Sequence, residues 1–310
     1  MIKLGIIGTN WITQQFIDAI KLSRKFDLTS VYSRHDQTAK TFAAKNGAQE
    51  TFTDLNAFFT KGQFETVYIA SPNSLHFEQA QMAIQHGKNV IVEKPAFSTQ
   101  KQMAKIQALL DENPQVLYFE AARNIHTENF HAIEKKLGQL KTVQGAEFTY
   151  SKYSSRYDLV LEGEEPNVFS LKYAGGALQD LGVYTVYDAV ALFGMPEEAA
   201  YYSQLIRTGV DGKGTAILQY PEYNVTLNFS KITNSHMTSE IYGLKDLIEI
   251  DDAGEINAVI YIDDDRNKQV IGNTIDENPM LPEVEDFARV INDPKNPQNK
   301  HDYDYWRQLS

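Results

Sequence analysis

The sequence predicts an α/β protein of two domains, with a parallel sheet and crossover helices first and a large, mostly antiparallel open sheet second. Three observations carry this prediction. The chain has 310 residues, about twice the length of a typical domain. In its first part, short apolar runs alternate with segments of helical periodicity, as in parallel strands joined by helices. In its second part, apolar and polar residues alternate, as in antiparallel strands with one buried face.

The predicted strands of the first part are nearly continuous apolar runs, because a parallel strand is covered on both faces. They span residues 4–8, 28–32, 67–70, 90–93 and 116–120. Between them, apolar residues recur at helical spacing, for example around Phe16 and around Ile106.

The predicted strands of the second part are separated by Gly, Asp and Pro turn signals. They span residues 214–220, 225–230, 237–242, 247–250 and 257–262, and we predict that they form one sheet. A helix at 281–291 precedes a tail rich in Asn, Pro and Lys, whose return to the first domain stays open. The predicted domains are residues 1–122 and 123–310.

Composition restricts the partners. The net charge of −12 disfavours nucleic acid and anionic membranes. The absence of cysteine excludes disulfides and cysteine-bound metals, and His126 and His131 lie five apart, off the spacing of a metal-binding histidine pair, so we expect no metal. The sequence has no apolar run of about 20 residues and no signal-peptide pattern at its start, which makes cytoplasmic localisation the expectation.

The segment from Gly8 to Thr13 stands where a G-x-G-x-x-G/A dinucleotide-binding turn would stand, directly after a strand and at the start of an amphipathic helix. Only the first glycine is present. Asn10 takes the second position, where we expect a positive φ, and Thr13 takes the third. The helix N-terminus offers N–H groups and a positive dipole end to a pyrophosphate. The alternative is an ordinary strand-to-helix turn. The predicted contacts are Gly8, Thr9, Asn10, Trp11 and Ile12.

The end of the second strand indicates which cofactor is bound. An acidic residue there would bind the ribose 2′-hydroxyl of NAD, whereas this sequence has Ser33 and Arg34. A guanidinium pairs with a 2′-phosphate, so NADP(H) is the preferred cofactor and NAD(H) the second choice. The alternative is a surface arginine in a turn.

Two further strand ends are predicted to line the same crevice, because ligands bind at the carboxyl ends of parallel strands. The first carries Ser71, Pro72, Asn73 and, at the start of the next helix, His76, for which a purely structural role is the alternative. The second carries Glu93 and Lys94 before Pro95, which holds the backbone extended and makes the Lys94–Pro95 bond a candidate for the cis form.

In the second domain, Gly175 and Gly176 lead into a helix that carries Asp180 and Tyr184. Their spacing of four places both side chains on one face, where a carboxylate and a phenol converge on one substrate. The alternative is a capped helix with a tyrosine in the core.

In this order and spacing, the turn at Gly8, the Ser71 and Glu93 segments, Glu120-Ala121 and the glycine-led helix resemble the glucose-fructose oxidoreductase, inositol dehydrogenase and rhizopine-catabolism family (Gfo/Idh/MocA) over nearly the whole chain. The resemblance implies an N-terminal Rossmann domain and a C-terminal domain whose open sheet forms the interface of a homodimer or homotetramer. Tyr184, where many members have His, is similar to the dihydrodiol and xylose dehydrogenase branch.

The resemblance also implies the roles. Lys94 matches the active-site lysine, Asp180 the substrate-binding acid and Tyr184 the general acid/base. The expected reaction is hydride transfer between nicotinamide C4 and a carbinol carbon of a sugar, polyol or diol, with the phenolate favoured by the Lys94 ammonium. Expected substrate contacts are Arg123, Asn167 and Phe169. Two alternatives stay open, a regulator that binds NAD(P) without turnover and redox-assisted glycoside cleavage.

Overall fold

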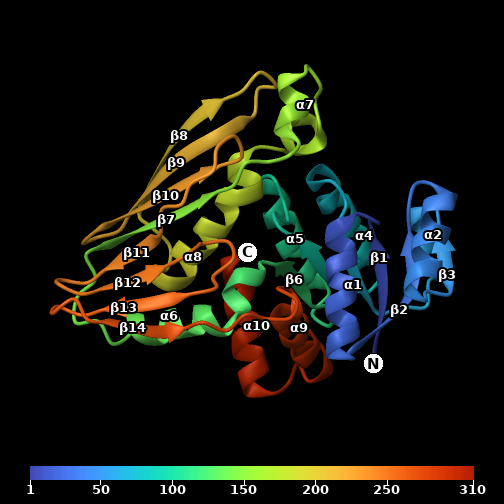
Figure 1. Ribbon diagram of the computed structural model, residues 1–310. Coiled ribbons are helices and arrows are strands. Elements are labelled where there is room, and N and C mark those ends of the chain that lie inside the picture. The colour runs from blue at the N-terminus through green and yellow to red at the C-terminus, as the bar shows by residue number, and fades with distance from the viewer. The chain divides into compact units, whose positions relative to one another are not determined.

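A computed structural model describes residues 1–310 as two compact units. Unit 1 comprises Met1–Ala121 and Asp276–Ser310, and unit 2 comprises Ala122–Ile275 (Figure 1). The predicted fold class is confirmed: unit 1 holds a parallel sheet and unit 2 a mostly antiparallel one. None of the helices combines the length and the apolar character that a membrane crossing requires.

The sheet of unit 1 has six parallel strands in the order β3-β2-β1-β4-β5-β6. They are β1 (Ile2–Ile7), β2 (Phe26–Tyr32), β3 (Glu50–Phe52), β4 (Thr66–Ile69), β5 (Asn89–Glu93) and β6 (Tyr118–Ala121). The strand order reverses its direction of growth between β1 and β4, and a crevice at such a point is where open α/β sheets bind ligands.

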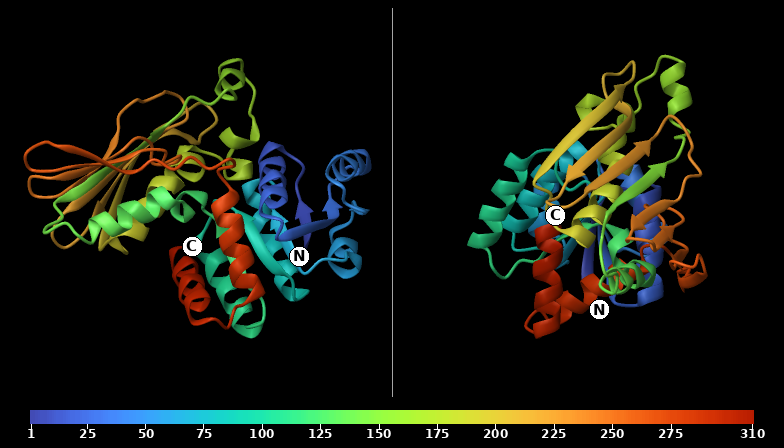
Figure 2. Two further views of the ribbon diagram at one scale, coloured as in Figure 1. Left: turned by 60° about the horizontal axis from the view of Figure 1, so that its bottom comes forward. Right: turned by 90° about the vertical axis from the view of Figure 1, so that its left-hand side faces the viewer.

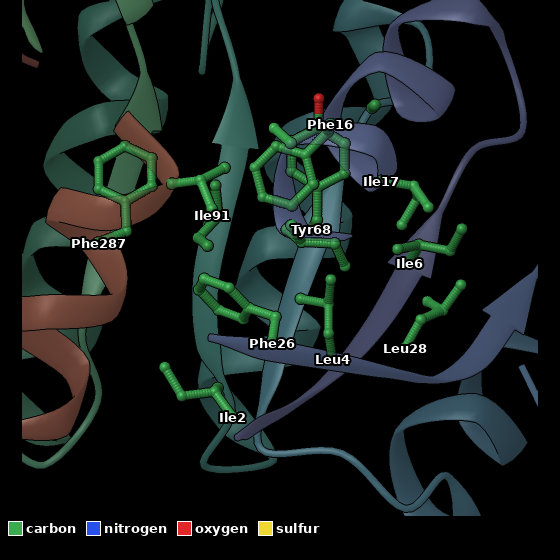
Figure 3. Packing of buried hydrophobic residues seen from close by; sticks show 14 of the residues in the cluster. Ile2, Leu4, Ile6, Phe16, Ile17, Phe26, Leu28, Tyr68, Ile91 and Phe287 are labelled. Carbon is green, nitrogen blue, oxygen red and sulfur yellow. The ribbon is translucent and has the colours of Figure 1, made fainter. Parts of the chain in front are cut away.

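Helices cover both faces of this sheet. They are α1 (Trp11–Ser23), α2 (Asp36–Asn46), α3 (Leu55–Lys61), α4 (His76–Gln85), α5 (Gln100–Glu112), α9 (Leu281–Asn292) and α10 (Pro297–Leu309). One core joins the sheet to α1, α2, α9 and α10, and the other joins it to α3, α4 and α5. Figure 3 shows the first core, where Phe16 of α1 stacks on Tyr68 with 3.8 Å between ring centroids.

The C-terminal segment completes unit 1 although it follows unit 2 in the sequence. Phe287 of α9 packs on Phe119 of β6, with ring centroids 4.7 Å apart. Tyr303 of α10 accepts a hydrogen bond from the N–H of Tyr118 at 3.2 Å. Figure 2 shows both helices, coloured red, beside the strands of this sheet. The C-terminal tail, whose return to the first domain the sequence did not decide, therefore folds onto the first sheet.

Unit 2 contains an eight-stranded sheet in the order β14-β13-β12-β11-β7-β10-β9-β8 (Figure 1). Its strands are β7 (Gly145–Ser151), β8 (Glu198–Leu205), β9 (Asp211–Gln219), β10 (Asn224–Ser230), β11 (Ser239–Tyr242), β12 (Leu247–Ile250), β13 (Val259–Ile262) and β14 (Lys268–Gly272). Every pair is antiparallel except β7 and β10, which run parallel at the centre.

The helices of unit 2 are α6 (Glu128–Leu137), α7 (Tyr157–Leu161) and α8 (Val183–Phe193), the last preceded by a π turn at Leu178–Gly182. Short 3₁₀ turns lie at Arg123–His126, Asn167–Phe169 and Leu171–Tyr173, and in unit 1 at Asn73–Leu75. Helix α8 contacts β7 and β10, and α6 contacts β12, β13 and β14. Alternate residues of β9 and β10 are buried against this helical layer, as period-two strands require.

Four strands were not predicted from the sequence. Strand β3 has only three residues, too short for a periodic signal. Strand β8 is exposed along its whole length and carries no alternation, so only its pairing with β9 makes it a strand. Strands β7 and β14 were also missed, although β7 alternates around Phe148.

Candidate functional site

The turn after β1 needs glycine because two strand ends approach each other closely there. Gly8 has φ of +109°, a conformation that side chains disfavour. A Cβ on Gly8 would lie 2.5 Å from the carbonyl oxygen of Ala70, beside the end of β4. The single glycine of the turn is therefore required by the packing of the backbone itself.

The expectation of a positive φ at Asn10 is wrong. Asn10 is extended, with φ of −87° and ψ of −175°, and forms the N-cap of α1. Its Oδ1 accepts hydrogen bonds from the N–H groups of Ile12 at 3.0 Å and Thr13 at 3.1 Å. Its Nδ2 donates to the carbonyl oxygen of Ala70 at 2.9 Å. The role of Asn10 is thus played by its side chain, which caps α1 and connects the helix to the residue after β4.

The hydrogen bonds to Asn10 reduce the number of first-turn N–H groups of α1 that are available to a phosphate. Among the first-turn N–H groups of α1, those of Ile12 and Thr13 bind Asn10, and that of Trp11 is not engaged by this cap. A hollow of about 570 Å³ lies beside the turn. Of the predicted cofactor contacts it is lined by Thr9, Asn10 and Trp11, and its other lining residues are Gln14, Gln15, Asp18, Phe42, Lys45, Glu277, Asn278 and Pro279.

The end of β2 presents a cation at the predicted ribose position, and no acidic residue directly follows the strand. Ser33 follows the strand and donates its N–H to the carbonyl oxygen of Phe52 at 3.1 Å. Arg34 is exposed. Burial raises the pKa of the Tyr32 hydroxyl, the positive charge of Arg34 opposes that rise, and the negative charge of Asp54 adds to it. The first acid along the chain, Asp36, is bound to Lys40 at 2.7 Å.

His76 joins the ends of β4 and β5 from within the protein. It is 1% exposed, with Nε2 at 2.8 Å from the carbonyl oxygen of Ser71 and Nδ1 at 3.1 Å from that of Pro95. Burial lowers its pKa, which favours the neutral ring. The hydroxyl of Ser71 donates to Gln79 at 2.7 Å. Both ring nitrogens of His76 face backbone carbonyls, so the arrangement supports the structural alternative for this residue.

Glu93 and Lys94 lie at the end of β5 in different surroundings. Glu93 is buried and accepts a hydrogen bond of 2.6 Å from the hydroxyl of Tyr68, the ring that stacks on Phe16. Lys94 is half-buried, and the peptide bond between Lys94 and Pro95 is cis, as the sequence suggested. Glu93 thus belongs to the core of unit 1, whereas the partial exposure of Lys94 leaves it accessible to a ligand.

The remaining predicted cofactor residues follow β4. Asn73 begins the 3₁₀ turn Asn73–Leu75, and Pro72 is its N-cap. Ser71, Pro72 and Asn73 are all partly exposed. At the neighbouring strand end, the carboxylate of Glu120 accepts the N–H of Ala96 at 2.8 Å, which ties β6 to the chain after Pro95.

In unit 2 the glycine pair lets the segment before Asp180 pack closely. A Cβ on Gly175 would lie 2.7 Å from the carbonyl oxygen of Val168, and Gly176 has φ of +131°. The N–H of Leu178 then donates to Asp211 at 2.7 Å. Asp180 itself lies in the π turn, a widened helical turn that is frequent at functional sites.

Asp180 has a partner that the sequence analysis missed. It forms an ion pair with Lys231, the residue directly after β10. The Lys231 side chain is 2% exposed and that of Asp180 is 36% exposed. The ammonium also lies 5.0 Å from the ring centroid of Phe169. The available signal was a lysine in the apolar run after a buried strand, where a solvated lysine is not expected.

Tyr184 lies one turn beyond Asp180 and is 6% exposed. Its ring is perpendicular to that of Tyr150 at 5.5 Å, and the Arg123 guanidinium lies 5.8 Å from its centroid. Burial and the neighbouring Tyr184 raise the pKa of Tyr150. Arg123 pairs with Glu255 at 3.3 Å. Tyr184 therefore has a cation near its ring within its own unit.

A buried acid lies one further turn along α8. Asp188 is 1% exposed, and its Oδ1 accepts a hydrogen bond from Asn124 Nδ2 at 2.8 Å. Asn124 Nδ2 is also 3.3 Å from the carbonyl oxygen of Tyr184. Burial raises the pKa of Asp188 well above its ordinary value, which favours the neutral acid.

The three predicted substrate residues fall into different places. Arg123 contacts the ring of Tyr184, as described above. Phe169 is fully buried beneath the Lys231 ammonium, and Asn167 is exposed at the start of the 3₁₀ turn Asn167–Phe169. Unit 2 thus groups Arg123 with Tyr184, and Phe169 with Asp180 through Lys231.

Comparison with known proteins places both units in one family. Residues 2–121 match the oxidoreductase family with an NAD-binding Rossmann fold, GFO_IDH_MocA, and residues 132–249 match the GFO/IDH/MocA C-terminal domain. An uncharacterized oxidoreductase of Escherichia coli, YgjR, is 38% identical over 94% of this chain and 89% of its own length. The scyllo-inositol 2-dehydrogenase (NADP(+)) IolU of Bacillus subtilis is 38% identical over 95% of this chain and 90% of its own length.

Solved structures show the same fold at lower identity. A 3-ketoreductase from Actinomadura kijaniata, in complex with NADP and TDP-benzene, has a TM-score of 0.85 and 20% identity and covers 100% of this chain and 95% of its own. A levoglucosan dehydrogenase in complex with NADH and L-sorbose has a TM-score of 0.84 and 16% identity and covers 99% of this chain and 94% of its own.

Proposed function

This chain belongs to the GFO/IDH/MocA family of NAD(P)-dependent oxidoreductases, and we propose that it transfers a hydride between nicotinamide C4 and a carbinol carbon of a cyclic polyol or sugar. The observation that carries the proposal is the placement of two groups in unit 2: Asp180, a partly exposed acid of the π turn that is paired with Lys231, and Tyr184, a phenol in the first turn of α8. An acid of this kind accepts hydrogen bonds from substrate hydroxyls, and a phenol exchanges a proton with the reacting oxygen. The relative that acts on scyllo-inositol makes this polyol the first substrate to test.

Unit 1 has features that suit the dinucleotide. The N-terminus of α1 and the N–H of Trp11 are suited to the pyrophosphate, and Ser33 with Arg34 to the 2′-phosphate of NADP. The absence of an acidic residue directly after β2 fits NADP better than NAD. When bound, the cofactor supplies or accepts the hydride.

Three side chains of the protein have distinct proposed roles. Tyr184 gives or takes the hydroxyl proton of the reacting carbon, and the half-buried Lys94 supplies a positive charge for the reaction. Asp180 orients a second hydroxyl of the substrate. The cofactor-edge role for His76 and a cofactor contact for Glu93 are not proposed, because both side chains are bound inside unit 1.

The cofactor preference is tested by titrating NADPH and NADH against wild type and Arg34→Ala, following the fluorescence of the reduced nicotinamide. Loss of a guanidinium–phosphate pair is expected to weaken NADPH about tenfold or more and to leave NADH nearly unchanged. Lys40→Ala removes another exposed cation of the same region and serves as the matched control. Equal losses for both cofactors would contradict the 2′-phosphate role of Arg34.

The catalytic roles are tested by steady-state reduction of NADP⁺ with scyllo-inositol and a panel of sugars and diols. We expect Lys94→Ala and Tyr184→Phe to lower kcat by roughly a hundredfold or more while NADPH still binds. Tyr187→Phe, a buried tyrosine of the same helix, is the control for a general effect of hydroxyl removal in α8. Normal turnover in both Lys94→Ala and Tyr184→Phe would refute the assignment, and nucleotide binding without turnover of any substrate would favour a regulator.

We further propose that copies of this chain associate through the open face of the sheet in unit 2. Strand β8 is exposed along its length, with Tyr202 at 65%. By register Tyr202 shares a face with half-buried Ile217, and at the other end of the sheet Val270, 58% exposed, pairs with Ile260. Exposed apolar side chains towards both ends of one sheet face favour an interface between subunits. Light scattering should give a dimer or tetramer that Tyr202→Lys weakens, and a monomeric wild type would refute the proposal.

A further inference from the structure

We propose that Lys231 is a positioning residue of the active site, which holds Asp180 in its ionised form and in one orientation toward the substrate. The inference rests on the proposed role of Asp180 and adds a residue to it. Its basis is the placement of a buried ammonium behind a carboxylate that is itself partly exposed. A substrate would approach Asp180 from the exposed side, whereas Lys231 contacts it from the protein side.

The backbone fixes Lys231 on both sides. Its N–H donates to the carbonyl oxygen of Gly212 at 2.9 Å, and its carbonyl accepts the N–H of Ser154 at 2.9 Å. These bonds connect the end of β10 to the start of β9 and to the loop after β7. Hydrogen bonds to two other segments of unit 2 therefore fix the position of the Lys231 main chain.

The π turn is held against the same strand. A Cβ on Gly182 would lie 2.9 Å from the ring of Phe229, two residues before Lys231, so the turn and β10 are in direct contact. Asp180 and Lys231 thus approach each other from two packed elements. Phe169, fully buried, provides an aromatic face 5.0 Å from the ammonium, an additional favourable contact for a cation.

The energetic consequence follows from burial. A lysine that is 2% exposed is costly unless a charge compensates it, and removing one member of a buried pair leaves the other uncompensated. For Asp180 the adjacent ammonium favours the carboxylate over the neutral acid, which cannot accept two hydroxyl hydrogen bonds as well. Lys231 therefore acts on substrate binding through Asp180 and not by touching the substrate.

The test compares Lys231→Met, Lys231→Arg, Asp180→Asn and the double variant Asp180→Asn/Lys231→Met as holoenzymes with NADP⁺ and scyllo-inositol. We expect Lys231→Met to raise KM at least about tenfold and to leave NADPH affinity unchanged. Because an opposite charge is lost, the acidic limb of kcat/KM should move to higher pH by about one unit or more. Lys231→Arg should retain most of the wild-type KM and pH profile.

The double variant separates this role from simple loss of folding. If Lys231 acts through Asp180, the change to Met adds little to KM once Asp180 is Asn, and the double variant has a higher Tm than Asp180→Asn because it no longer buries an ammonium that has lost this carboxylate. Additive KM effects, or an unmoved pH profile in Lys231→Met, would overturn the proposal. An unchanged KM in Asp180→Asn would instead refute the proposed function of Asp180, and the Tm comparison would still test the pair. If Lys231→Met does not fold, Lys231→Gln is measured in its place against the same outcomes.

Discussion

The buried acid on α8 allows a prediction of stability against pH that needs no substrate. Asp188 is 1% exposed, and its Oδ2 has no hydrogen-bond partner, as is also true of Oδ1 of Asn124, the residue that already binds its other oxygen. We infer that Asp188 is protonated in the folded protein and donates that proton to Asn124 Oδ1, which would give both oxygens a partner. In Asp188→Asn an amide N–H replaces that proton, so we expect the variant to fold.

The sign follows from the direction of the pKa shift. The pKa of Asp188 is raised well above its ordinary value of 3.8, so the folded protein keeps a proton that the unfolded chain loses. Between the two pKa values the free energy of unfolding of the wild type falls as pH rises, by up to about 1.4 kcal/mol per pH unit. Asp188→Asn does not titrate. The difference in free energy of unfolding between Asp188→Asn and wild type should therefore increase by the same amount per pH unit above pH 4, which corresponds to roughly 3–6 °C in Tm per pH unit.

The assay is thermal unfolding of both proteins by circular dichroism at half-unit steps from pH 4 to pH 8. Asp264→Asn, which removes the same charge from an exposed turn, is the control and should follow the wild-type slope. A constant difference in Tm between Asp188→Asn and wild type would refute the reasoning, because the buried carboxyl would then titrate alike in the folded and unfolded states.

Four substitutions at three positions test other packing relationships. Gly8→Ala places a methyl group against the carbonyl oxygen of Ala70 at a positive φ, so we expect a loss of roughly 1–3 kcal/mol in urea unfolding and weaker NADPH binding. Asn10→Ala should cost about 1 kcal/mol through loss of the N-cap. Asn10→Asp keeps the cap acceptor but replaces the donor to the Ala70 carbonyl by a carboxylate oxygen, so it should also lower stability, and it should lose NADPH affinity through charge repulsion. Gly182→Ala should cost roughly 1–3 kcal/mol because its methyl meets Phe229, and should raise KM by displacing the π turn.

The pattern of the sequence was sufficient for the elements whose periodicity is strong. The five predicted parallel strands are present with ends shifted by one or two residues, since hydrophobic periodicity defines the middle of an element better than its limits. Strand β8 could not be predicted, because its residues are exposed and its conformation depends on pairing with β9. The return of α9 and α10 to the first sheet is a tertiary contact that local pattern does not encode.

Only part of the candidate site could be predicted, because some of its residues meet through tertiary contacts that local pattern does not encode. Motif position predicts Lys94, Asp180 and Tyr184 as candidates, but nothing in their spacing reveals Lys231, which approaches Asp180 from 51 residues along the chain. The conformation of Asn10 was mispredicted because backbone tolerance was considered before side-chain hydrogen bonding, and the side chain has three partners.

In the sequence, unit 2 is inserted between the two segments of unit 1, so the last two helices of unit 1 are synthesised after all of unit 2. Strand β6 is followed by Ala122–Ile275 before α9 and α10 supply the cover for Phe119. Until that segment is complete, one face of the first sheet lacks two of its helices and presents apolar side chains to solvent. A fragment that ends at Ala121 would therefore carry every predicted nucleotide contact and still be prone to aggregate, and the nucleotide-binding half of this enzyme can reach its native core only after the last helix has been made.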